Sequence, residues 1–487
     1  MSGVDDAAFR RKAVSGVGWV AADKWSNRLM GLVVLTVLGR LLTPTEFGLV
    51  ALATAFMALA NVFVDQGFGR AIVQRKDLTS ADTSTAFWIS LASSGLLAVI
   101  TVLCAPLISS LFGEGDSLTP IIQWLSVGLV VNALSSVPAA LLEREFRFKS
   151  LAIRRFIGTV LGGVSAIVLA LLGFGVWSLV AQTLVAAVAG LITLWLASRW
   201  RPRLEFSRAA LRTLWAIGGS IMGIELIGLV NSQADRLLIG AFLDAEALGY
   251  YYLAMRVVSI MGELFSSVFS GVALTTFSRL QADRPRLLAW FYKLTSLSSS
   301  FAIPFFAIAA VTAPVIIPLV FGAQWDDSVV LFRILCFLGA LNAVAYFDRS
   351  VLLAVGRAKA ALLLTLGQSV LGVILVVIAL PFGVVAVAVA VALRQYLYWP
   401  MRLITLKRNV GVAPGKYWAQ WFRPFLVSVV VVAGSVGLAA LFPGLIDHPV
   451  GFLAAHAGWA LVGFGIGMWL VNRSLYTDVL RLVRRQL

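Results

Sequence analysis

The stretch FGVWSLVAQTLVAAVAGLITLWLASRWRPR, residues 174–203, contains the pattern that decides the fold. Its first part, residues 174–197, carries no charged side chain and is long enough to cross a bilayer as a helix. Three arginines, Arg199, Arg201 and Arg203, follow at once. Because every backbone polar group in hydrocarbon needs an internal partner, each apolar segment of this kind is expected to be an α-helix.

The same unit recurs along the whole chain of 487 residues, which is 60% hydrophobic and only 13% charged. A soluble core could not bury this much apolar surface, so we expect an all-α polytopic membrane protein with about fourteen transmembrane helices. The polar start, residues 1–12, does not resemble a cleaved signal peptide. The expected spans are 14–40, 46–66, 84–112, 119–141, 151–172, 174–197, 213–240, 247–277, 289–319, 327–347, 358–380, 382–401, 417–442 and 450–472.

Positive charge is distributed unevenly between the gaps that separate these spans. Of the 39 Lys and Arg residues, 32 lie in the two terminal segments or in and directly beside every second gap, and the other gaps contain none. Since cytoplasmic loops are enriched in Lys and Arg, both termini are predicted to be cytoplasmic and the number of spans to be even. The net charge of +16 is thus explained by membrane topology, and we expect no nucleic-acid partner.

An internal repeat divides the chain further. Residues 42–48 (LTPTEFG) and residues 243–249 (LDAEALG) lie 201 residues apart, and each joins an outward span to an inward one. The repeat predicts two pseudo-symmetric six-helix lobes around a central cavity. The expected boundaries are 1–212 for the first lobe, 213–408 for the second, and 409–487 for two further helices and a cytoplasmic tail.

Seven cations are not explained by topology, and anions also lie within predicted spans. Charged groups in mid-membrane are costly, so they are expected to face protein or a water-filled cavity. Arg40 and Arg333 lie near span ends and can reach the interface. The other cations, predicted to bind an anionic ligand such as a diphosphate, are Lys24, Arg28, Arg236, Arg256 and Arg394. The polar residues predicted to line the cavity, or to couple transport to a proton or Na⁺, are Asp23, Glu225, Asp235, Ser259 and Glu263.

A structural alternative stays open for each of these residues. Buried ion pairs, such as Lys24 with Glu225 or Asp235 with Arg256, would tie helices together without any ligand. With only two histidines, no metal site is expected, and no cofactor is predicted. No nucleotide-binding loop or catalytic triad is recognisable, so we do not expect an enzyme.

Several short motifs occur in an order that resembles one family. They are residues 38–51 (LGRLLTPTEFGLVA), 65–67 (DQG), 71–75 (AIVQR), 85–88 (TAFW), 142–148 (LEREFRF), 175–177 (GVW) and 235–240 (DRLLIG). The sequence resembles the polysaccharide, or lipid-linked oligosaccharide, flippases of the O-antigen or colanic-acid exporter type. These belong to the multidrug/oligosaccharidyl-lipid/polysaccharide superfamily. The similarity covers nearly the whole chain and is densest over residues 10–260.

The resemblance implies alternating access in a bacterial inner membrane. The implied substrate is an undecaprenyl-diphosphate-linked oligosaccharide, flipped to the outer leaflet for cell-surface polysaccharide biosynthesis. Implied partners are membrane lipids, a glycan polymerase and glycosyltransferases. In the related lipid II flippases, cations on helices 1, 2 and 8 hold the diphosphate, and Lys24 or Arg28 and Arg256 match that pattern. The second span has no internal cation, so the third one is expected from Arg236 or Arg394, or is absent.

Three other functions are considered. A cation-coupled multidrug or metabolite antiporter of the same superfamily would depend on Glu225 or Asp235 and would have an electronegative cavity. A non-transporting scaffold for glycan assembly would not need the cavity charges. An integral-membrane glycosyltransferase would need an acidic motif on a sizeable loop, and the external loops are short.

Overall fold

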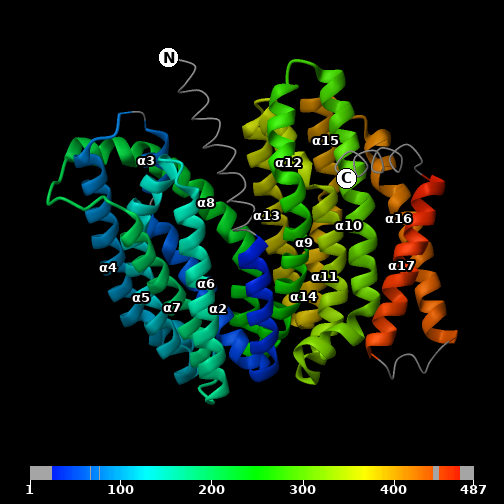
Figure 1. The fold of residues 1–487 in the computed structure, drawn as a ribbon, viewed down its shortest axis with the longest axis horizontal. Helices are drawn as coiled ribbons and strands as arrows, with labels where there is room; N and C mark the ends of the chain where they lie inside the picture. Colours follow the sequence, from blue (N-terminus) through cyan, green and yellow to red (C-terminus); the bar gives the residue numbers. More distant parts are fainter. Residues whose placement is uncertain (1–24, 66, 76, 442–448, 472–487) are drawn as a thin grey trace. The chain divides into compact units, whose positions relative to one another are not determined.

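The computed structural model describes residues 25–65, 67–75, 77–441 and 449–471. Within these ranges the chain is helical almost throughout and forms no β-strand, which confirms the predicted all-α class (Figure 1). The chain folds as two compact units, unit 1 (Met1–Tyr252) and unit 2 (Leu253–Leu487). The division falls within one long helix. The lobe boundaries deduced from the repeat stay predictions.

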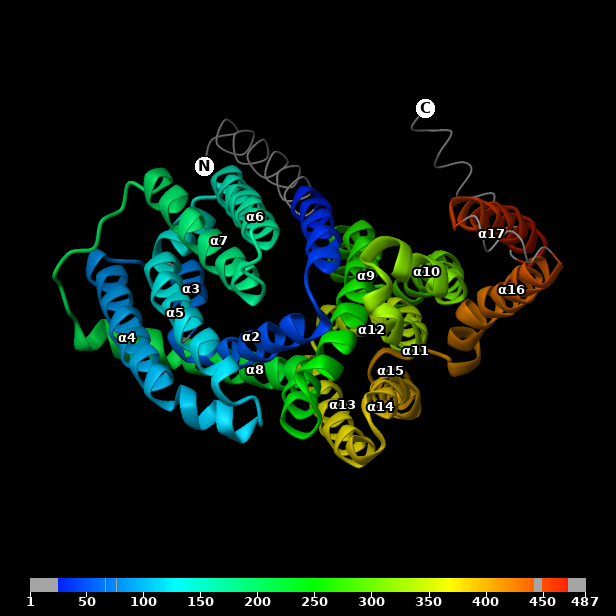
Figure 2. The same ribbon diagram turned by 90° about the horizontal axis from the view of Figure 1, so that it is seen from below.

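Unit 1 is built from helices, several of which are long and apolar enough to cross a membrane. Figure 2 shows them from below. Residues 25–41 form its first described helix. The following helices are α2 (Pro44–Asp65), α3 (Phe68–Gln74), α4 (Ser80–Leu111), α5 (Gly115–Arg144), α6 (Phe148–Leu171), α7 (Val176–Ala197), α8 (Arg208–Phe242) and the start of α9 (Ala245–Arg279).

Unit 2 contains the rest of α9 and a second set of helices. They are α10 (Arg284–Phe321), α11 (Asp326–Val344), α12 (Tyr346–Ala354), α13 (Ala358–Ala379), α14 (Val384–Leu397), α15 (Trp399–Val410), α16 (Pro414–Leu441) and α17 (Pro449–Val471), with short 3-10 turns at Ala323–Trp325 and Leu380–Phe382. The last pair, α16 and α17, packs against α10. An aromatic core that includes Phe291, Phe347 and Tyr417 joins α10, α12 and α16.

Eleven helices in the described part of the chain are long and apolar enough to cross a membrane. The three predicted spans outside this set are 14–40, 213–240 and 247–277. Residues 25–41, α8 and α9 occupy those stretches. Both α8 and α9 contain 35 residues, about 52 Å of helix, which exceeds the hydrocarbon thickness. These three are the segments to which the sequence assigns most of the mid-membrane charges. The total of fourteen stays a prediction.

Two predicted spans continue, after a break, as a second short helix. The helix α12 follows α11 after a break at Ala345, and α15 follows α14 after a break at Tyr398. Parts of α12 and α15 were predicted as cytoplasmic loops because of their charges. Pro400 stands in the first turn of α15, where its missing N–H costs no helical hydrogen bond.

The repeated segments pack on one another within unit 1. A side chain at Gly48 would overlap the carbonyl group of Ala245, and a side chain at Gly249 would overlap that of Pro44. Under the repeat offset of 201 residues, Pro44 corresponds to Ala245 and Gly48 to Gly249. The contact is therefore reciprocal, as expected for equivalent segments related by a pseudo-twofold axis. This geometry supports the internal duplication.

Candidate functional site

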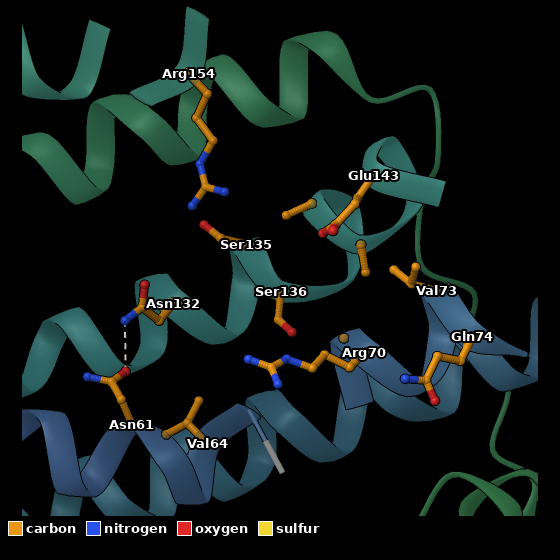
Figure 3. A pocket seen from close by; sticks show the side chains of 13 residues that line it. Asn61, Val64, Arg70, Val73, Gln74, Asn132, Ser135, Ser136, Glu143 and Arg154 are labelled. Carbon is orange, nitrogen blue, oxygen red and sulfur yellow. Dashed lines mark hydrogen bonds between the residues drawn. The ribbon is translucent and has the colours of Figure 1, made fainter. Parts of the chain in front are cut away.

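Unit 1 contains two adjoining pockets that share Asn132, Glu143 and Arg154, and we call them together the N-terminal cavity. Their volumes are about 550 and 590 Å³, within the range of ligand-binding sites. Figure 3 shows the first pocket, with the Arg154 side chain extending toward Ser135 and the Arg70 side chain toward Ser136. The polar lining residues are Asn27, Asn61, Arg70, Gln74, Asn132, Ser135, Ser136, Glu143, Arg154, Arg155 and Thr159.

One face of α5 forms the back wall of the N-terminal cavity. Asn132, Ser135, Ser136 and Glu143 recur at helical spacing, so they lie on the same side of this helix. The Asn132 side-chain amide donates a 2.7 Å hydrogen bond to Asn61 Oδ1 on α2. Neutral hydrogen-bonding groups thus line a space between helices that are otherwise apolar, which makes the space suitable for water and polar ligands.

The short helix α3 brings Arg70 to this cavity. It begins after Gly67, whose φ of 69° is in the left-handed region that favours glycine. Phe68, Ala71 and Ile72 on α3 are fully buried and fix its position. Arg70 Nη2 lies 2.6 Å from Glu225 Oε1 on α8, and the Arg70 side chain is 62% exposed. Arg70 therefore has one carboxylate partner and still faces the cavity.

Arg154 enters the cavity from α6, which packs closely on α7. Gly158 and Gly162 allow this approach, because a Cβ atom at either position would lie 2.8 or 2.6 Å from a carbonyl oxygen of α7. The Arg154 side chain runs along Gly190, another glycine of α7. Among the residues that the structure describes, its guanidinium forms no hydrogen bond or ion pair. Arg154 is thus available to an anionic ligand.

The charged residues that line the cavity favour an anion. They are three arginines, Arg70, Arg154 and Arg155, and one carboxylate, Glu143. Arginine carries its charge at all accessible pH values and binds phosphate groups through two parallel N–H donors. The arrangement can therefore bind a phosphate or diphosphate group and leaves space beside it for hydroxyl-rich groups.

Only part of the predicted site lies at this cavity. Asp23 and Lys24 lie outside the described residues. Arg28 is half-buried on the helix 25–41, directly after Asn27, which lines the cavity and accepts a 2.6 Å hydrogen bond from the Thr159 hydroxyl. Glu225 reaches the cavity through Arg70.

Asp235 and Arg236 take part in contacts between α8 and the start of α9. The Tyr251 hydroxyl donates to Asp235, and the Arg236 guanidinium lies 5.2 Å from the centre of the Tyr252 ring. Arg236 also donates a 3.0 Å hydrogen bond to Gln233. In the structure, these two side chains hold the helix pair together. Their predicted part in ligand binding stays a prediction.

The remaining predicted residues lie in unit 2. Arg256 is exposed. Ser259 and Glu263 line a separate pocket of about 320 Å³ that Asn342 also lines and that contains no lining cation. Arg394 packs against Gly372 of α13, whose missing side chain leaves room for the guanidinium. The geometry thus does not bring Arg394 to the Ser259–Glu263 pocket as a lining residue.

Sequence reasoning missed Arg70 and Arg154 because both were counted among the loop cations that set the topology. Two signals could have identified them. Arg70 follows the motif residues 65–67, whose glycine turns the chain directly after the second span. Asn61 and Asn132 are isolated amides in apolar spans, and such residues mark polar cavities or helix contacts in membranes. Arg70, on the helix that follows the second span, thus places a cation beside that span.

Residues 37–330, more than half of the chain, match the family described as "Polysaccharide biosynthesis protein". The lipopolysaccharide biosynthesis protein WzxC of Escherichia coli (strain K12) is 28% identical over 72% of this chain and 71% of its own length. The succinoglycan biosynthesis transport protein ExoT of Rhizobium meliloti (strain 1021) is 29% identical over 63% and 62%.

The fold is also similar to that of a solved membrane protein. The lipid II flippase MurJ, in an inward closed conformation, matches 93% of this chain and 98% of its own with a TM-score of 0.75 at 15% identity. At this identity the likeness establishes the fold alone, and it confirms the predicted all-α polytopic fold. The family resemblance deduced from the motifs is confirmed by the match over residues 37–330. The chain therefore belongs to the polysaccharide biosynthesis protein family.

Proposed function

We propose that this protein is a flippase that carries an undecaprenyl-diphosphate-linked oligosaccharide from the cytoplasmic to the outer leaflet of the inner membrane. Transport proceeds by alternating access, without covalent chemistry and without a cofactor. The family match and the named biosynthetic relatives support the substrate class. The enzymes that assemble and polymerise the glycan are the proposed partners.

One observation carries the proposal: Arg70 and Arg154 line the same cavity in a unit made of membrane-spanning helices. A diphosphate and a sugar chain cannot enter hydrocarbon without losing their hydration. The N-terminal cavity offers them cations, amides and hydroxyls, while the isoprenoid chain can stay in lipid. Placing arginines among membrane-spanning helices is costly unless a ligand or water compensates for their charge.

The cavity lies at one end of unit 1. Asn61 and Glu143 are near the last residues of α2 and α5, and Arg154 is near the start of α6. We propose that this end is cytoplasmic, because the adjoining loops are the basic ones. A membrane potential that is negative inside by about 100 mV then favours outward movement of each anionic charge by about 2.3 kcal/mol. The flip therefore needs no coupling ion, although Glu263 is a candidate site if one is used.

The test is a flipping assay in proteoliposomes with a fluorescent undecaprenyl-diphosphate-linked oligosaccharide. Replacing Arg154 by Gln is expected to reduce the flipping rate about 10-fold or more, because a charged hydrogen bond to the diphosphate is lost. The matched control is Arg423→Gln, which removes an exposed arginine of α16 that does not line the cavity. Equal rates for wild type and Arg154→Gln, at equal amounts of folded protein, would overturn the proposal. So would efflux of organic cations that depends on Glu225 or Asp235.

A further inference from the structure

We propose that Glu225 is a built-in counter-ion of the N-terminal cavity. Its carboxylate pairs with Arg70 when no ligand is bound, and an incoming anion must compete with this carboxylate for the arginine. The site thereby selects diphosphates over anions of lower charge. This inference rests on the proposed function, because it concerns the same anion site.

The contact geometry gives the two partners different positions. Arg70 lines the cavity, whereas Glu225 does not, and the Glu225 side chain is 26% exposed compared with 62% for Arg70. Arg70 is therefore the partner that a ligand meets first. The single contact, from Nη2 to Oε1 at 2.6 Å, engages one edge of the guanidinium. The arginine has further N–H donors beyond this contact, and its side chain lines the cavity.

The backbone around Arg70 is held in place by its neighbours, so only the side chain can move when a ligand binds. Gly67 lies against the backbone of Gly218 on α8 so closely that a Cβ atom would come within 2.5 Å of the Gly218 carbonyl oxygen. Together with the buried residues Phe68 and Ile72, this contact fixes α3 against its neighbours. The exchange of one anion for another at Arg70 then requires only a rotation of the arginine or of Glu225.

The exchange explains a preference for charge. Ion pairs with this much solvent exposure are weak, so a ligand can displace the carboxylate. A monovalent anion gains little, because it replaces one negative charge by another. A diphosphate can displace Glu225 from Arg70 and contact Arg154 at the same time, and both arginines line the same pocket. The carboxylate thus penalises ligands that cannot use both cations.

The experiment measures binding of inorganic diphosphate and inorganic phosphate to the full-length protein in nanodiscs by calorimetry. In Glu225→Gln, phosphate is expected to bind about twofold to fivefold more tightly, which is the range of a partly exposed ion pair. The affinity for diphosphate should rise less, so the ratio of the diphosphate affinity to the phosphate affinity should fall. The matched control is Glu143→Gln, which removes a carboxylate that lines the cavity and forms no described pair with Arg70. Glu143→Gln should tighten the binding of both anions without lowering the ratio of the diphosphate affinity to the phosphate affinity.

An unchanged affinity ratio in Glu225→Gln, or weaker binding of both anions, would overturn the counter-ion role. If Glu225→Gln does not fold, Glu225→Asp gives the same comparison, because a shorter carboxylate weakens the pair and should shift the ratio in the same direction. Arg70→Gln separates this inference from the proposed function. Loss of diphosphate binding in Arg70→Gln with no effect of Glu225→Gln rejects only the counter-ion. Unchanged diphosphate binding in Arg70→Gln rejects the anion site itself.

Discussion

In unit 2, Arg402 lies against Asp348 with 3.6 Å between Nη1 and Oδ2, and the two side chains are only 13% and 5% exposed. The Tyr417 hydroxyl donates to the same carboxylate, and Arg402 Nη2 donates to Gln368 at 3.1 Å. In unit 1, Arg154 faces a cavity and has no such partner among the described residues. Each unit thus places an arginine between helices. Arg402 has a carboxylate and an amide as partners, whereas Arg154 has neither among the described residues.

The difference separates two uses of charge in an apolar protein. The unit 2 network crosses two helix breaks, because Asp348 and Arg402 follow the breaks at Ala345 and Tyr398. Three residues before the respective breaks, Gln395 donates a 2.6 Å hydrogen bond to Asn342. This network ties α12, α15 and α16 together. In unit 1, Arg154 keeps hydrogen-bonding capacity free for a ligand, and this capacity is a common sign of function.

The largest expected effect concerns the unit 2 network. Replacing Asp348 by Ala leaves Arg402 buried without its carboxylate and should cost about 3–5 kcal/mol of stability. Replacing both partners, as in Asp348→Leu with Arg402→Met, should cost much less, because no buried charge is left unpaired. The measurement is thermal unfolding of the purified protein in nanodiscs.

The control for this prediction is Arg154→Met in unit 1. It should change stability by no more than about 0.5 kcal/mol, because the guanidinium forms no hydrogen bond or ion pair with the described residues that the mutation would break. Equal destabilisation by Asp348→Ala and Arg154→Met would contradict the distinction between the paired Arg402 of unit 2 and the ligand-accessible Arg154 of the N-terminal cavity.

A smaller effect is expected where α6 meets α7. A methyl group at Gly162 would lie 2.6 Å from the Gln182 carbonyl oxygen, so Gly162→Ala should force the helices apart and cost about 1–3 kcal/mol. Because α6 carries Arg154, flipping should slow as well. The matched control is Gly95→Ala on α4, where no atom lies within 4 Å of the added group. A stable Gly162→Ala variant with normal flipping would show that this packing does not position Arg154.

The sequence was sufficient to predict an all-helical membrane protein, because long apolar segments have few alternatives in a bilayer. It also located the repeat, whose reciprocal contact between Gly48 and Gly249 follows from equivalent positions. The breaks at Ala345 and Tyr398 were not predicted, since α12 and α15 carry the charges that mark a loop. Packing, rather than hydropathy, decides that these segments are helical.

The site was predicted less completely. Arg70 and Arg154 were counted among the loop arginines that set the orientation of the chain in the membrane. They were therefore not considered as ligand-binding residues. One cation can do both tasks when a span ends beside a cavity, and only the three-dimensional arrangement reveals this. The sequence singles out Glu225 as a carboxylate within a predicted span, but its pair with Arg70 depends on the packing of α3 against α8. No spacing rule in the sequence connects these two residues.

The most direct test of the account is an experimental structure of the protein with bound undecaprenyl diphosphate. We expect density for the diphosphate within hydrogen-bond distance of both Arg70 and Arg154, with the Glu225 carboxylate no longer in contact with Arg70. Density for the diphosphate elsewhere, for example at the pocket lined by Ser259 and Glu263, with Arg70 still paired to Glu225, would contradict it.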